Sequence, residues 1–180
     1  MTNERDVMLV AACLRGERRA FDKLVESYER PLFNAAFRIT GSIEDAMDAT
    51  QAAFVNAFEK LHTFNPEYRF FSWIYRIAVN QSLNIVSRRR DESELDGNFP
   101  APTNNPETAY RGAESARLLE DALMQLVPDH RAVIVLRHVE GFSYNEIGEL
   151  LGIPEKTVKS RLFSARRQLR SILNDWGVTP

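Results

Sequence analysis

The stretch SYNEIGELLGIPEKTVKSRLFSARRQLRSIL, residues 143–173, decides the fold of this chain. Ser143 followed by Glu146 is the signature of a capping box, which predicts the start of a short helix. Gly152 and Pro154 then predict a tight turn, and a longer basic helix follows. A short helix, a glycine turn and a second helix form the pattern of a helix-turn-helix, whose second helix enters the major groove of DNA.

The second helix of this pair has two opposite faces. Apolar residues at helical spacing predict an inward face, made of Val158, Leu162, Ala165, Leu169 and Ile172. The opposite face carries Lys156, Lys159, Ser160, Phe163 and Arg167. Basic side chains can contact phosphates or guanine edges, and an aromatic ring can contact thymine methyls. The alternative is a solvated basic face on a packing helix, but such a face seldom needs Phe163 opposite the core.

Charge is distributed unevenly along the chain, although the net charge is only −2. Residues 69–90 contain five arginines and no acid, and residues 155–170 contain six basic residues and one acid. Residues 91–112 contain five acids and one arginine. A phosphate backbone responds to such local patches, so the mean charge does not argue against nucleic-acid binding.

The segment 91–112 also divides the chain, because its prolines, glycines and asparagines show no apolar periodicity. We interpret it as a flexible acidic linker. The rest reads as helices without strand-like alternation. The predicted fold class is therefore all-α, with two small helical domains at residues 1–90 and 113–180 joined by the linker 91–112.

Four helical stretches are predicted in the first domain after residue 20. Phe21, Leu24 and Tyr28 share one face of the first, Pro31 starts or kinks the second, and Gly41 ends that one. Ser42 and Asp45 resemble a capping box that opens the next helix, which runs to about His62. A stripe of alanines marks its inner face, and Asp45 and Asp48 lie on another.

The last predicted helix of this domain runs from about Arg69 to Arg90. Its polar residues recur every four positions and so form one stripe along the helix: Ser72, Arg76, Asn80, Asn84 and Arg88. Arginines, amides and neighbouring aromatics are the groups that hold unstacked single-stranded bases. For Phe70 and Trp73, packing in the core is the favoured interpretation.

Four segments in order give the chain a family resemblance across nearly its whole length. They are 44–54 (EDAMDATQAAF), 73–80 (WIYRIAVN), 141–148 (GFSYNEIG) and 157–162 (TVKSRL). They resemble regions 2.2, 2.4 and 4 of extracytoplasmic-function (ECF) sigma factors. The resemblance implies a protein that binds RNA polymerase core and directs it to promoter DNA.

The resemblance implies a role for each matching position. The residues implied to dock on the clamp helices of the large polymerase subunit are Asp45, Asp48, Gln51 and Phe54. Those implied at the downstream (−10) element are Arg76, Asn80, Asn84 and Arg88, with Asn80 helping to capture a flipped base. Those implied at the upstream (−35) element are Lys156, Thr157, Lys159, Ser160, Phe163, Ser164 and Arg167. Some family members carry arginine where this chain has Ser164, so their base preference is not transferred. An inhibitory anti-sigma factor is also implied.

Two other kinds of DNA-related protein stay open as alternatives. One is a free-standing helix-turn-helix repressor or activator, which would need a dimer interface and a palindromic site. The other is a sigma-like decoy that binds only an anti-sigma protein.

Catalysis, cofactors and membranes have no support in the sequence. His62, His130 and His138 lack metal-ligand spacing, and no nucleophile elbow or phosphate loop occurs. We therefore expect no enzyme activity, no metal and no cofactor. The single cysteine, Cys13, and the lack of a signal peptide or apolar span favour the cytoplasm, without membrane contact.

Overall fold

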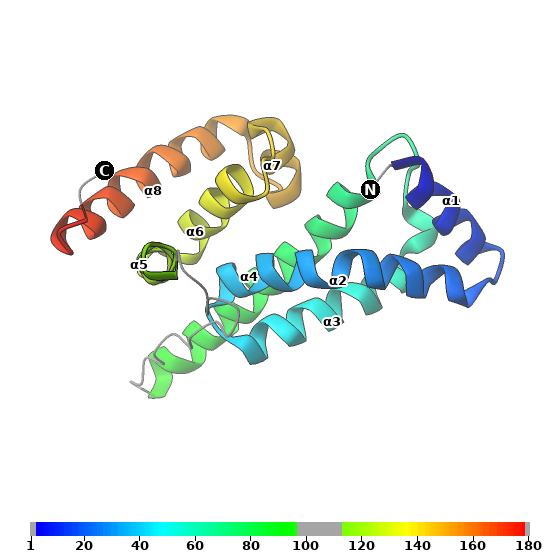
Figure 1. The fold of residues 1–180 in the computed structure, drawn as a ribbon, viewed down its shortest axis with the longest axis horizontal. Coiled ribbons are helices and arrows are strands. Elements are labelled where there is room, and N and C mark those ends of the chain that lie inside the picture. Colours follow the sequence, from blue (N-terminus) through cyan, green and yellow to red (C-terminus); the bar gives the residue numbers. More distant parts are fainter. Residues whose placement is uncertain (1–2, 97–112, 179–180) are drawn as a thin grey trace.

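The computed structural model of the protein describes residues 3–96 and 113–178. Those residues form helices and connecting turns, with no β-strand among them, as the all-α prediction requires (Figure 1). The first part comprises α1 (Asn3–Leu14), α2 (Arg18–Thr40), α3 (Ile43–Glu59), the 3-10 turn η1 (Leu61–Thr63) and α4 (Phe70–Asp96). The second part comprises α5 (Ala113–Met124), α6 (Pro128–Ile134), the π-helical turn η2 (Val135–Val139), α7 (Tyr144–Leu151) and α8 (Glu155–Asp175).

Pro31 does not start a separate helix, which was one of the two expectations stated for it. It lies inside α2, which continues without a break to Thr40. The fixed φ of proline fits a helix, and the residue removes only one backbone donor. Tyr28 and Leu32 on either side of it are both buried, so packing against the core holds the two halves of α2 in one helix.

α4 is longer than predicted, and the predicted linker is correspondingly shorter. The helix continues past Arg90 to Asp96. Residues 91–96 contain neither proline nor glycine, so no residue among them breaks a helix. The acids that suggested a linker are thus also compatible with a helix. The rest of the predicted flexible linker, residues 97–112, lies outside the described residues.

The core of the first part forms where α2, α3 and α4 meet. α3 contributes its predicted alanine stripe, and Ala46, Ala49, Ala53 and Ala57 are all fully buried. Small side chains let helix backbones approach closely, so the larger buried residues come from the neighbouring helices. These are Leu24, Tyr28, Leu32 and Ile39 of α2 and Phe70, Ile74, Tyr75 and Val79 of α4.

The second part packs α6, η2 and α7 against α8. Its buried residues are Ala132, Val133, Leu136, Ile147, Leu150, Val158, Leu162 and Ala165. The three from α8 belong to the predicted inward face, and the other two residues of that face, Leu169 and Ile172, pack against the same cluster while partly exposed. The inward face of α8 is therefore confirmed.

The two parts contact each other directly, which the sequence does not predict. One buried cluster runs through both of them, and α7 and α6 pack against α4 and α2. The ring of Phe142 lies 5.4 Å from that of Phe71 and 5.7 Å from that of Tyr75. Tyr75 donates a hydrogen bond of 2.9 Å to Glu140, and Arg131 donates one of 2.7 Å to the carbonyl of Ile39.

Arg131 is the most buried charge at this contact, with 6 % of its surface exposed. Burial lowers the pKa of its guanidinium to about 10, so the group is still charged at neutral pH. Its charge is offset by four backbone carbonyls, those of Leu123, Met124, Leu126 and Ile39. Arg131 therefore ties the end of α5 to the end of α2.

Candidate nucleic-acid interface

The helix-turn-helix predicted from residues 143–173 is present as α7 and α8. The capping box is reciprocal: Glu146 donates its backbone N–H to Ser143 Oγ at 3.3 Å, and Ser143 donates its own to Glu146 Oε2 at 2.7 Å. Gly152 ends α7 in the left-handed conformation with φ of 66°. The turn folds back tightly, since a Cβ on Gly148 would lie 2.8 Å from the carbonyl oxygen of Ile153. These contacts fix α8 relative to α7.

The outward face of α8 is open to solvent. Phe163 is 68 % exposed although it is a large apolar residue. Of the other positions predicted for the upstream element, Lys156, Lys159, Ser160 and Arg167 are exposed, and Thr157 and Ser164 are half-buried beside them. Every position predicted for the upstream element is thus at least partly accessible to solvent.

Several cations of this region already have partners within the chain. Lys159 pairs with Glu155 at 2.6 Å, and Arg161 pairs with Asp129 at 2.8 Å. Among the described residues, no ion pair holds Lys156 or Arg167. These two are the cations of the face most available to phosphate.

The polar stripe of α4 is exposed as well. Arg76, Asn80, Asn84 and Arg88 are open to solvent, and Ser72 is half-buried at the start of the helix. Phe70 is fully buried, as the core interpretation predicts, while Trp73 is only partly covered.

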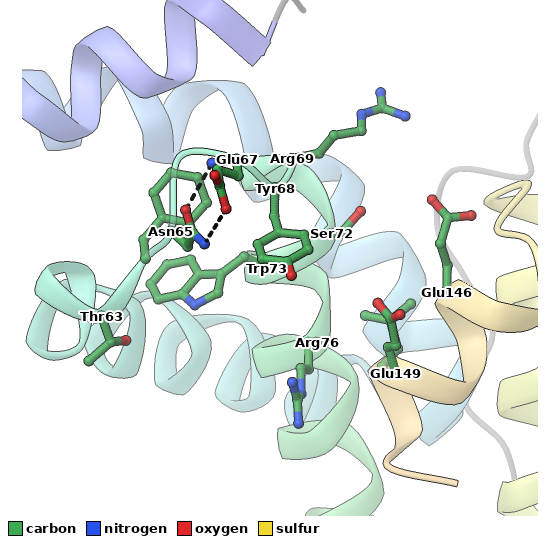
Figure 2. Close-up of a pocket in the computed structure, with 12 residues that line it drawn as sticks. Thr63, Asn65, Glu67, Tyr68, Arg69, Ser72, Trp73, Arg76, Glu146 and Glu149 are labelled. Carbon is green, nitrogen blue, oxygen red and sulfur yellow. Dashed lines mark hydrogen bonds between the residues drawn. The ribbon is translucent and has the colours of Figure 1, made fainter. Parts of the chain in front are cut away.

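A groove of about 780 Å³ lies at the start of this stripe (Figure 2). One wall is the loop between η1 and α4, the second is the first turns of α4, and the third is α7. The lining residues are Thr63, Phe64, Asn65, Glu67, Tyr68, Arg69, Ser72, Trp73, Arg76, Glu146, Glu149 and Leu150. Asn80, which the resemblance links to a flipped base, does not line this groove.

The loop that forms the first wall is held by its own hydrogen bonds. Asn65 accepts a bond from the backbone N–H of Glu67 at 3.0 Å and donates one to the Glu67 carboxylate at 3.1 Å. Tyr68 donates its backbone N–H to the carbonyl of Asn65. This wall is not among the sequence-based predictions, although Asn65-Pro66 is a turn signal directly before an arginine-rich helix.

The third wall of the groove is acidic. Glu146 and Glu149 project from α7 across from Ser72, Trp73 and Arg76 (Figure 2). Hydrogen bonds with Ser143 lower the pKa of Glu146, and Arg69 adds a smaller effect in the same direction. Glu146 is therefore ionised at neutral pH, and the groove combines a basic wall with an acidic one.

The positions predicted for polymerase docking fall into two groups on α3. Asp48 and Gln51 are exposed, next to the exposed apolar residues Met47 and Val55. Phe54 is 9 % exposed and packs in the core against Phe21, and its role in polymerase docking stays a prediction.

Asp45 has partners within the chain. The backbone N–H of Asp45 donates a hydrogen bond of 3.3 Å to the Ser42 hydroxyl. The Asp45 carboxylate does not complete the predicted capping box. The carboxylate instead pairs with Arg89 of α4 at 2.8 Å, and the Asp45 side chain is 22 % exposed.

Within residues 3–96 and 113–178, no group of histidine, cysteine, aspartate and glutamate side chains is placed to hold a metal ion. No helix in that part of the chain combines the length and the apolar character that crossing a bilayer requires.

A helix-turn-helix with an exposed basic and aromatic face, beside a second arginine-rich helix, defines a helical transcription factor. Comparison with known proteins makes the class specific. Residues 24–92 match Sigma-70 region 2, and residues 116–169 match Sigma-70, region 4.

Two curated relatives match over nearly their whole length. The chain is 33 % identical to the RNA polymerase sigma-H factor of Pseudomonas aeruginosa, over 96 % of both chains. It is 32 % identical to the ECF RNA polymerase sigma-E factor of Escherichia coli, over 91 % of this chain and 92 % of that one. The protein belongs to the ECF sigma factors, which are transcription initiation factors.

Solved structures agree with this assignment. The sigma factor RpoE of Bartonella quintana, in complex with the anti-sigma factor NepR, superposes with a TM-score of 0.73 at 25 % identity over 86 % of this chain and 96 % of that one. CnrH, in complex with the cytosolic domain of CnrY, superposes with a TM-score of 0.70 at 27 % identity over 95 % and 98 % of the two chains.

Proposed function

We propose that this sigma factor binds promoter DNA at two separate surfaces, one for duplex and one for unwound strand. The observation that carries the proposal is the outward face of α8, where Phe163 is 68 % exposed on the same face as Lys156, Lys159 and Arg167. Leaving an apolar ring in contact with water is unfavourable unless a partner covers it, and thymine methyls in the major groove are a suitable partner. Lys156 and Arg167 supply phosphate contacts on either side.

The second surface is the stripe of α4 together with the groove at its start. Tyr68 and Trp73 offer rings on which an unstacked base can lie, and Arg69 and Arg76 offer charge to the backbone beside it. The exposed Asn80, Asn84 and Arg88 extend this surface along α4. We assign the downstream promoter element to it, as a single strand.

We assign RNA polymerase core to the exposed face of α3, with Asp48 and Gln51 on the clamp helices of the large subunit. An anti-sigma factor is the proposed regulator, supported by the NepR-bound relative among the similar structures. The chain has no catalytic role of its own in this proposal, needs no cofactor and acts in the cytoplasm, where transcription takes place.

The test is transcription in vitro with core polymerase and genomic DNA, with start sites mapped. Wild-type protein is expected to direct initiation at a limited set of sites that share two spaced elements. Asp48→Lys is expected to abolish both core binding and initiation, and it is cleaner than a change at Asp45, which would also break the Arg89 ion pair. Glu29→Lys, an equal charge reversal at an exposed position of α2, is the matched control.

The rival class predicts a different outcome. A dimeric repressor would protect a palindrome tightly without polymerase, and would show no dependence on Asp48. That result would overturn the proposed function.

A further inference from the structure

Glu155 is an acid on the surface proposed to bind an anionic ligand. It is the one acid among residues 155–170, which include six basic residues, and it is exposed in the first turn of α8. An acid in the first turn suits the helix dipole. The phosphates of a bound duplex would nevertheless repel it, so Glu155 is unsuited to contact with the DNA backbone.

Glu155 holds Lys159 in place. The two residues are four positions apart on one side of α8, and the Glu155 Oε1 and Lys159 Nζ atoms are 2.6 Å apart. The hydrogen bond and the charge of Glu155 raise the pKa of the Lys159 ammonium, which therefore stays protonated. The Nζ atom also lies 5.9 Å from the centre of the Tyr144 ring, and the guanidinium of Arg137 lies 4.9 Å from the same ring. Glu155 and Tyr144 together restrict where the ammonium can point.

The ion pair presents a donor and an acceptor side by side to solvent. The side chain of Lys159 is 58 % exposed and that of Glu155 is 45 % exposed. An ammonium has three donors and a carboxylate accepts several hydrogen bonds, so both groups keep capacity for a further partner.

A G·C base pair offers the complementary groups in the major groove. Guanine shows its O6 and N7 acceptors there, and the N4 amine of cytosine is a donor. O6 and N4 are hydrogen-bonded to each other within the base pair, so they are about 2.9 Å apart. The 2.6 Å between Nζ and Oε1 matches that spacing, so one ion pair can contact both bases.

We infer that Glu155 and Lys159 together read one G·C base pair of the upstream element, with Lys159 donating to guanine and Glu155 accepting from the cytosine amine. The inference rests on the proposed binding of duplex DNA by α8. It makes Glu155 a specificity-determining residue, although the family resemblance implies no role for this position.

The order of donor and acceptor sets the expected base preference. With the base that faces Lys159 written first, C·G and A·T both turn an amine toward the ammonium and an oxygen toward the carboxylate, which are unfavourable pairings. T·A keeps the right order but has a methyl group where guanine has N7. We therefore expect G·C to be preferred, T·A to follow, and C·G and A·T to be rejected.

The test measures promoter use by the holoenzyme of full-length protein and core polymerase. Templates are built on one mapped promoter, each base pair of the upstream element is varied in turn, and transcripts are counted by sequencing. At one position, wild type should use G·C at least about tenfold better than C·G or A·T. Glu155→Gln should reduce that ratio to about threefold or less, because an amide can donate as well as accept and no longer rejects the wrong order. Lys159→Ala should change the preference at the same position.

Asp175→Asn is the matched control, since it removes the same charge from an exposed position at the other end of α8. It should leave every base ratio within about twofold of wild type. Loss of the interaction between Glu155 and the helix dipole would weaken all templates alike, so a purely structural role would not change the ratios.

The outcomes separate this inference from the proposed function. If wild type discriminates among bases but Glu155→Gln behaves like Asp175→Asn, the inference is wrong and the function stands. The inference is also wrong if Glu155→Gln and Lys159→Ala act at different positions, or if the shared position prefers a pair other than G·C. If wild-type holoenzyme shows no preference anywhere in the upstream element, the proposed duplex recognition fails, and the inference fails with it.

Discussion

Replacing Arg131 by methionine tests how much its buried hydrogen bonds stabilise the second part and its contact with α2. The guanidinium donates four hydrogen bonds of 2.7–3.0 Å to backbone carbonyls. Two of these carbonyls end α5, one belongs to Leu126 just after it, and one belongs to Ile39 near the end of α2. Methionine fills a similar volume but cannot donate a hydrogen bond. The four carbonyls would then be left without this donor in a region that water reaches poorly.

The expected magnitude follows from the number and burial of these bonds. A hydrogen bond to a charged group contributes about 1.5–3 kcal/mol, so four would give about 6 kcal/mol or more if they added. The variant also avoids the cost of burying the charge, and neighbouring bonds are not additive. We therefore expect Arg131→Met to lower the free energy of unfolding by about 3–5 kcal/mol.

The measurement is urea unfolding followed by circular dichroism at the helix band. With a slope of about 2 kcal/mol per molar urea, the midpoint should fall by about 1.5–2.5 M. Arg170→Met is the matched control, since Arg170 is exposed on α8, and its effect should stay within about 0.5 kcal/mol. A loss below about 1 kcal/mol for Arg131→Met would refute the reasoning.

Three further predictions concern single residues of the second part. His138 accepts a hydrogen bond from Arg166, and its pKa is lowered, mainly by burial and then by the charge of Arg166. The folded protein therefore disfavours protonated His138, so stability is full above pH 6.5 and falls as the pH drops from 6.5 through the lowered pKa. In an NMR titration, Arg166→Gln should move the pKa of His138 back toward 6.5, and an unchanged value would contradict this. Gly148→Ala should lower stability by about 1–2 kcal/mol in a thermal melt, because its methyl meets the Ile153 carbonyl, despite better helix propensity. Lys159→Ala should weaken some promoter variants by about 1–3 kcal/mol more than others in a binding assay, and a uniform loss would indicate a phosphate contact.

Much of the local structure was predictable because its causes lie within a few residues. The capping box of Ser143 and Glu146, the glycine end of α7 and the inward face of α8 all follow from spacing along the chain. The exposed stripe of α4 was predictable for the same reason. Four ordered segments were enough to predict the family that the comparisons then showed.

Two helix bounds differ from the sequence-based expectations. Pro31 does not start a new helix, because α2 runs through it, and α4 extends past Arg90 to Asp96. Phe54 lies on a helix face that the sequence alone does not assign to core or surface, and its ring packs in the core. Asp45 has an ion-pair partner 44 residues away, which no local pattern reveals.

By itself the sequence determined the helices, the helix-turn-helix and the family, since periodicity, caps and turn residues act over short distances. Only the tertiary structure decided that the two parts touch, that Arg131 joins α6 to the end of α2, and that α7 places two carboxylates over the groove. Those features depend on pairs of residues up to 92 positions apart, such as Arg131 and Ile39. Contacts at that separation arise from how whole helices pack, and the chain carries no local signal of them.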